Sequence, residues 1–337
     1  MRKVLLLLLT LILIITQGCT NAKYETAETV IIACSDFQNP NGSKAGKNEI
    51  LSIITSIESD GINSADALLF CGDYDYETYN DQEKVIDGIA NLKSAFSGFV
   101  DGQMVLAQGN HDTPAGTNGM SKSGANDPTN DAYGVFVINN DDYMWYNSDE
   151  EAIKNTAVSL NNYLTDKINA KFKKPIFILS HLSLHYSMRT VNDGDGMFAN
   201  YIFDVLNSAA ESGLNIIFLY GHNHSNGWDD YLGGSSVFLA KGDKILIAQA
   251  DRTIYKEETL NFTYMNAGYV GYYSNVNGAD DSLTITVFKI DGDGLTICRY
   301  SKNGLHLLKS KGVRNSYKNE IGYEVNKNEY TSPQVVN

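Results

Sequence analysis

Short apolar runs alternate with amphipathic patterns along the first two thirds of this sequence, and this alternation restricts the possible folds more than any other feature. Apolar runs at residues 29–35, 66–71 and 104–107 predict buried strands. Between them, residues 48–59 and 81–97 carry apolar side chains at helical spacing. A β-α-β-α-β series of this kind is typical of a mostly parallel sheet.

The alternation continues to residue 220 and then gives way to short β-type runs. Further strands are predicted at 133–138, 174–180 and 214–220, and helices at 156–170 and 196–212. The later runs, separated by Gly and Asp, cover 237–240, 245–248, 261–265, 269–273, 283–290 and 295–300. We expect these later runs to form a second, more antiparallel sheet packed on the first. No Pro-rich linker divides the chain, so one domain over residues 29–308 is expected, with a polar tail at 309–337.

Polar side chains follow the ends of five predicted strands. They are Asp36 with Gln38, then Asp73, then Asn110 with His111 and Asp112, then His181, and finally His222 with His224. Ligands of open α/β sheets bind outside the carboxyl ends of the strands, so we expect these groups to gather at one edge. Five of the six histidines lie in or beside this set. Imidazole and carboxylate together suit Zn, Fe or Mn.

The order of these motifs resembles that of the calcineurin-like metallophosphoesterase superfamily. The matching motifs are Asp36-x-Gln38, Gly72-Asp73, Gly109-Asn110-His111-Asp112, His181 and Gly221-His222-x-His224. The resemblance implies an α/β fold, a four-layer α/β/β/α sandwich of two mixed sheets flanked by helices. It also implies a binuclear metallophosphoesterase, a hydrolase that cleaves phosphomonoester or phosphodiester bonds by in-line attack of a metal-bridging hydroxide.

The resemblance further implies a role for each motif residue. Asp73 would bridge two divalent or trivalent metal ions (Mn, Fe or Zn), since a carboxylate can ligate both. The first ion would be held by Asp36, Gln38 and His224, and the second by Asn110, His181 and His222. His111 would bind no metal and would reach the substrate phosphate or the leaving group, steered by Asp112. Imidazole suits proton donation because it titrates near neutral pH.

Gln38 departs from the family pattern, which usually has His at this position. Three alternatives stay open: Gln38 binds the metal directly, holds a metal-bound water, or leaves the first position weak. The third alternative allows a different function: the protein would be a catalytically weakened family member that acts as a surface binding lipoprotein. His185, four residues after His181, either lines the substrate cleft or braces its loop.

The N-terminus has the pattern of an export signal. Arg2 and Lys3 precede an apolar run over residues 4–15, which is too short to span a bilayer comfortably. Gly18-Cys19 then resembles the lipobox of bacterial lipoproteins, which implies cleavage after residue 18 and a lipid anchor on Cys19. Residues 19–28 would be a tether, and the protein would be extracytoplasmic, at the cell surface or in the periplasm. The alternative is an ordinary secretory signal with a chance cysteine.

Charge and cysteine content exclude several classes of function. The net charge of −14 disfavours nucleic-acid binding, which needs a basic surface. Cys34, Cys71 and Cys298 are too widely spaced for a disulfide framework or a zinc knuckle, and Cys34 and Cys71 read as small buried apolar residues. The expected partners are a phosphate-ester substrate and a membrane reached through the lipid anchor, and no protein partner is predicted.

Overall fold

The computed structural model describes residues 29–38, 44–75, 81–143, 149–184, 198–222, 238–249, 255–271, 283–291, 294–306 and 334–336. Its first half contains β1 (Thr29–Cys34), α2 (Lys44–Ser59), β2 (Ala65–Phe70), α3 (Gln82–Phe96), β3 (Val100–Leu106), the 3-10 helix η2 (Thr113–Ala115), β4 (Gly124–Ala125), β5 (Gly134–Ile138) and α4 (Glu150–Asn169). The second half contains β6 (Ile176–Ser180), α5 (Ala199–Glu211), β7 (Ile216–Tyr220), β8 (Phe238–Leu239), β9 (Lys244–Ala248), β10 (Tyr255–Thr259), β11 (Thr263–Asn266), β12 (Ile285–Asp291), β13 (Gly294–Ser301), β14 (Gly304–His306) and β15 (Gln334–Val336).

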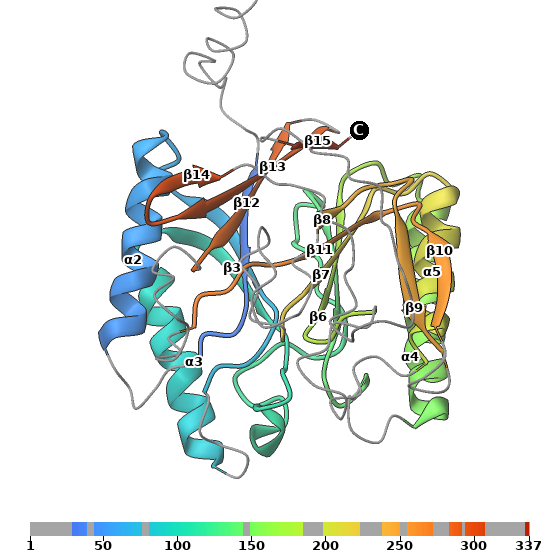
Figure 1. Cartoon of the computed structure of the whole chain (residues 1–337), viewed down its shortest axis with the longest axis horizontal. Helices are drawn as coiled ribbons and strands as arrows, with labels where there is room; N and C mark the ends of the chain where they lie inside the picture. The colour runs from blue at the N-terminus through green and yellow to red at the C-terminus, as the bar shows by residue number, and fades with distance from the viewer. Residues whose placement is uncertain are drawn as a thin grey trace, which may run out of the picture.

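Two mixed sheets face each other and are covered on their outer sides by helices (Figure 1). The first sheet has the order β14-β13-β12-β1-β2-β3, with β15 also paired to β13. The second has the order β4-β5-β6-β7-β11-β8, and β9 and β10 form a separate ribbon. Helices α2 and α3 lie on the first sheet, and α4 and α5 lie beside the second (Figure 1). The expected four-layer α/β/β/α sandwich is therefore confirmed.

The central strands β5, β6 and β7 are buried on both faces, as their continuous apolar runs predicted. Neighbouring residues of a strand point to opposite faces of the sheet. Accordingly, Ile32 and Leu68 pack in the apolar layer under α2 and α3, whereas Ile31 and Leu69 pack in the layer between the two sheets. No helix in the described ranges is both long and apolar enough to cross a bilayer.

The expectation that the C-terminal strands form a sheet of their own is wrong. β12 and β13 extend the first sheet, because β12 pairs antiparallel with β1. β11 instead joins the second sheet, parallel to β7. The sequence missed this division because apolar runs show that a segment is a buried strand but not which partner it pairs with.

The layer between the sheets gives a first prediction, for Phe177 on β6. Its ring is fully buried and packs edge-on against Phe288 of the other sheet, with the ring centroids 4.9 Å apart. Phe177→Ala should lower the free energy of unfolding by about 3–5 kcal/mol, because it leaves a cavity between two rigid sheets. Urea denaturation measures this loss. The control is Val158→Ala on α4, where the side chain is 58% exposed; an equal cost for both variants would contradict the prediction.

Candidate metal centre

The predicted site residues come from strand ends of both sheets. Asp36 and Asp73 follow β1 and β2 of the first sheet, and His181 and His222 follow β6 and β7 of the second. In each sheet the two strands run parallel, so their ends lie at the same edge. Backbone hydrogen bonds join the loops that follow: Asp36 N donates to Gly72 O, and Gly221 N donates to His181 O. The sequence thus places ligand-type side chains on the edges of two packed sheets.

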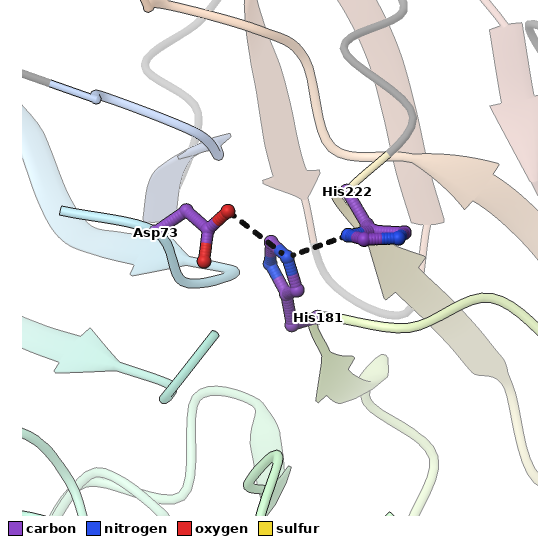
Figure 2. A group of neighbouring side chains, drawn as sticks. All are labelled: Asp73, His181 and His222. Atoms are coloured by element: carbon purple, nitrogen blue, oxygen red, sulfur yellow. Dashed lines mark hydrogen bonds and ion pairs between the residues drawn. The ribbon is translucent and has the colours of Figure 1, made fainter. Parts of the chain in front are cut away.

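Asp73, His181 and His222 form the centre of the site, with ligand atoms all within 4.8 Å of one another and all three side chains buried. His181 lies between the other two (Figure 2). Its Nε2 is 3.4 Å from Asp73 Oδ2 and 3.2 Å from His222 Nδ1. The Asn110 side-chain oxygen completes the group, 2.9 Å from His181 Nε2 and 3.0 Å from His222 Nδ1.

The hydrogen bonds of His181 indicate which of its nitrogens faces the group. Nδ1 lies 2.6 Å from the backbone oxygen of Cys71, which can only accept, so Nδ1 carries a hydrogen. In the neutral ring, Nε2 then presents a lone pair to the oxygens of Asn110 and Asp73. Electron-rich atoms facing one another in this way need a proton or a metal ion between them. In protein metal sites, the ring nitrogen of a histidine that does not bind the metal commonly donates to a backbone carbonyl, as Nδ1 does here. These residues therefore fit a metal.

The pKa values reflect this crowding of polar groups. Burial alone would raise the pKa of Asp73, but the charges of His181, His111 and His222 outweigh it and hold the pKa well below its usual range. Burial alone would lower the pKa of His181, but the Asp73 carboxylate, with a smaller contribution from Asp36, raises it to about 9. The Asp73 carboxylate therefore favours a positive charge at this point.

Asp112 holds the loop after β2 through the backbone. Its fully buried carboxylate accepts hydrogen bonds from Asp73 N at 2.8 Å, Tyr74 N at 3.0 Å and Gly109 N at 2.7 Å. Burial and then the charge of Asp73 raise the pKa of Asp112 to about 7, against these three bonds. These contacts suit a residue that supports the metal centre, whereas the predicted steering of His111 stays a prediction.

His111 lies over the same carboxylate as His181. Its backbone N donates to Asp73 Oδ1 at 3.0 Å, and its ring Nε2 is 3.9 Å from Asp73 Oδ2. The residue is 6% exposed. Its ring therefore borders the centre, and its predicted role toward a substrate remains a prediction.

Asp36 and Gln38 are fully buried beside this group. The carboxylate of Asp36 accepts from His222 N, at 3.0 Å to Oδ2 and 3.2 Å to Oδ1, and Gln38 N donates to Asp73 O. Four predicted ligands have left-handed backbones, with φ of 54° at Asp36, 43° at Gln38, 64° at Asp73 and 67° at His222. Residues other than glycine seldom adopt this backbone conformation, and those that do are often found at functional sites. The predicted positions of His224, His185 and Cys19 lie outside the described residues.

Two glycines let the loops after β2 and β3 touch. A Cβ on Gly72 would lie 2.5 Å from the backbone N of Gly109, and a Cβ on Gly109 would lie 2.2 Å from Asp73 Oδ1. A Cβ on Gly109 would displace the Asp73 carboxylate, and a Cβ on Gly72 would displace the backbone of Gly109 or the ring of His181. Both glycines stand within the motifs quoted from the sequence, but the sequence gave no sign of the Cys71 carbonyl, because a backbone contact leaves no trace in residue types.

A second prediction follows for Gly109. Gly109→Ala should displace Asp73 and so reduce the metal bound per chain and lower the melting temperature. Metal analysis and thermal unfolding measure the two effects. The matched control is Gly98→Ala, where a Cβ would meet nothing within 4 Å. Retention of wild-type metal content by Gly109→Ala would show that the carboxylate can move without loss of binding.

Comparison with known proteins shows the family of this chain. The family model for calcineurin-like phosphoesterase matches residues 29–248, which contain every predicted metal-site residue. The chain belongs to the calcineurin-like phosphoesterase family. Membership of this family and the cluster of Asp73, His181 and His222 support a metal-dependent phosphoesterase, a hydrolase.

Solved structures similar to this chain share little sequence identity with it. A dimetal phosphatase from Danio rerio is 9% identical, with a TM-score of 0.52, and the match covers 84% of this chain and 99% of that one. PhoD is 12% identical, with a TM-score of 0.43, over 89% of this chain and 68% of that one. GAP50, the anchor in the inner membrane complex of Plasmodium, is 11% identical, with a TM-score of 0.44, over 92% and 91%. No curated protein matches the sequence.

Proposed function

We propose that this chain is a binuclear phosphoesterase that hydrolyses phosphomonoesters or phosphodiesters. The observation that carries the proposal is the meeting of Asn110, His181 and His222 around one point beside Asp73. Two bound metal ions would supply Lewis-acid chemistry, that is, activation of water and neutralisation of phosphoryl charge. Asn110, His181 and His222 would hold one ion, Asp36, Gln38 and His224 the other, and Asp73 both.

The chain itself would orient the substrate and move one proton. His111 lies beside Asp73, on the side of η2. Its backbone N donates a hydrogen bond to Asp73 Oδ1, and this bond fixes the backbone position from which the ring extends. From there Nε2 would donate a proton to the leaving oxygen as the ester bond breaks. Asp112 would keep the loop of Asp73 in place through its three backbone bonds.

The direct test is metal analysis of the soluble chain, residues 20–337, together with hydrolysis of mono-aryl and bis-aryl phosphates in added Mn. We expect close to two metal ions per chain and turnover, and the preferred ester gives the substrate class. No metal and no turnover under any condition would overturn the proposal. That result would favour the alternative function, a surface binding lipoprotein whose first metal position is weakened by the glutamine at position 38.

Gln38 gives a further prediction within this function. An amide oxygen is a weaker ligand than imidazole for Zn or Fe, so Gln38→His should tighten binding of the ion at the first position. Competition with a chromogenic chelator measures that affinity, and Gln103→His on β3 is the control for an added imidazole. If neither metal affinity nor turnover changed in Gln38→His, residue 38 would not be a ligand.

We also propose that the protein is exported and anchored through lipid on Cys19. The support is the sequence alone: Arg2 and Lys3, the apolar run and the Gly18-Cys19 pair. Fractionation and mass spectrometry of the mature N-terminus test this proposal. Cys19→Ser should release the protein from membranes; an unchanged membrane fraction, or an N-terminus without lipid, would exclude the anchor.

A further inference from the structure

The hydroxyl of Ser35 lies between the Asp36 carboxylate and the backbone of another segment. Ser35 Oγ is 2.5 Å from Asp36 Oδ2 and 2.7 Å from Gly268 O, and the residue is fully buried. A hydroxyl has one hydrogen to donate and both neighbours can accept it. An ionised carboxylate is the stronger acceptor, so when Asp36 is ionised, as a metal ligand must be, the hydrogen bond goes to Asp36.

This contact fixes the orientation of the Asp36 carboxylate. Ser35 Oγ and His222 N both bond Oδ2, at 2.5 Å and 3.0 Å, and His222 N also lies 3.2 Å from Oδ1. Two donors on one oxygen hold the carboxylate against rotation.

Ser35 is itself held by residues 266–270, here named the crossover segment. This segment runs from the end of β11 in the second sheet to the end of β1 in the first, where Val270 N donates to Ser35 O at 3.1 Å. Gly268 N donates to Asn266 Oδ1 at 2.8 Å, and the fully buried guanidinium of Arg299 on β13 donates to Asn266 O. The acceptor beside Ser35 is therefore part of a rigid, internally bonded segment.

We propose that Ser35 is a positioning residue that sets the metal affinity of the first position through Asp36, an inference that rests on the proposed binuclear function. With glutamine at position 38 in place of imidazole, binding at this position depends more heavily on Asp36. The carboxylate therefore has to be presented in one orientation. The crossover segment and Ser35 hold it there before any ion binds, which reduces the conformational entropy lost on binding.

The test compares Ser35→Ala with Ser180→Ala in Mn-loaded protein. Ser180 is the matched control, because it too is a buried serine directly before a predicted ligand at a strand end, and no bond of its hydroxyl is recorded in the described part of the chain. Loss of a residue that orients a ligand typically weakens metal affinity by about 10–100-fold. We expect that loss in Ser35→Ala at one position only. The electron paramagnetic resonance spectrum should change from a coupled Mn pair to an isolated ion, and Ser180→Ala should keep the pair.

Two further measurements separate positioning from general damage. The melting temperature of metal-free Ser35→Ala should stay close to that of Ser180→Ala, and turnover should recover at high Mn concentration. Should Ser35→Ala not fold, Ser35→Cys, with a weaker donor of similar shape, takes its place, and Ser35→Thr should restore affinity because it keeps the hydroxyl.

The outcomes distinguish this inference from the proposed function. Wild-type protein with two ions and Ser35→Ala with equal affinity at both positions would overturn the role of Ser35 alone. Equal losses in Ser35→Ala and Ser180→Ala would also overturn it. Wild-type protein without metal would overturn the binuclear function, and this inference with it.

Discussion

Asp73→Ala is expected to remove both metal ions and to reduce turnover below detection. Asp73 is the only carboxylate in the described cluster with His181 and His222, and it also bonds the backbone of His111. Its removal would take away the carboxylate nearest to the converging imidazoles and the one ligand proposed to hold both ions. The measurement is metal content by mass spectrometry together with aryl phosphate hydrolysis.

Two controls make the Asp73 prediction specific. Asp73→Asn keeps the volume and removes the charge, and it should lose metal nearly as completely if the charge is what matters. Asp101→Asn removes a carboxylate from the exposed start of β3, and it should behave as wild type. A turnover in Asp73→Ala near that of Asp101→Asn would refute the placement of the metal centre.

His111→Ala is expected to lower turnover by about 10²–10⁴-fold, the usual contribution of a positioned proton donor. Metal content should remain near two ions per chain, because His111 is not among the proposed ligands. Its ring nitrogen is 3.9 Å from Asp73 Oδ2, beyond hydrogen-bonding distance but beside the carboxylate that would hold both ions. Single-turnover hydrolysis and metal analysis of the same sample measure the two quantities.

The dependence on leaving group sharpens the His111 prediction. A nitrophenyl group leaves without a proton, whereas an alkoxide needs one. The loss in His111→Ala should therefore be far larger for an alkyl phosphate than for a nitrophenyl phosphate. Equal losses for both esters would argue against proton donation, and loss of metal in this variant would mean that His111 acts as a ligand or holds Asp73.

Sequence reasoning was most accurate where local pattern decides the structure. Apolar runs located β1, β2, β6 and β7, and the residues after these strands meet at one edge because parallel strands must end together. Helix starts were less accurate: α4 begins at Glu150, six residues before its predicted start, after the capping residue Asp149. The helix opens with two acidic residues, and the predicted start left out Ile153, which is buried at helical spacing from Ala157.

The remainder of the site depends on the backbone and could not be predicted. Nothing in the identities of Asp36 or Asp73 indicates that both have left-handed backbones. The contact of His181 with a carbonyl and the bonds of Asp112 to three amides likewise involve main-chain groups that every residue carries. Residue types could indicate which side chains gather, but not what holds them.

The pairing of β1 with β12 has a consequence for how the chain folds. β1, which leads directly to Ser35 and Asp36, lies between β2 and a strand near the far end of the domain, with Thr29 opposite Ile290. A nascent chain that has emerged only as far as residue 248, where the family match ends, lacks this neighbour. Its β1 edge is open to aggregation, and pairing across such a sequence separation is slow. The site should therefore mature late, after nearly the whole domain has been synthesised, and a fragment cut at residue 248 should aggregate rather than bind metal.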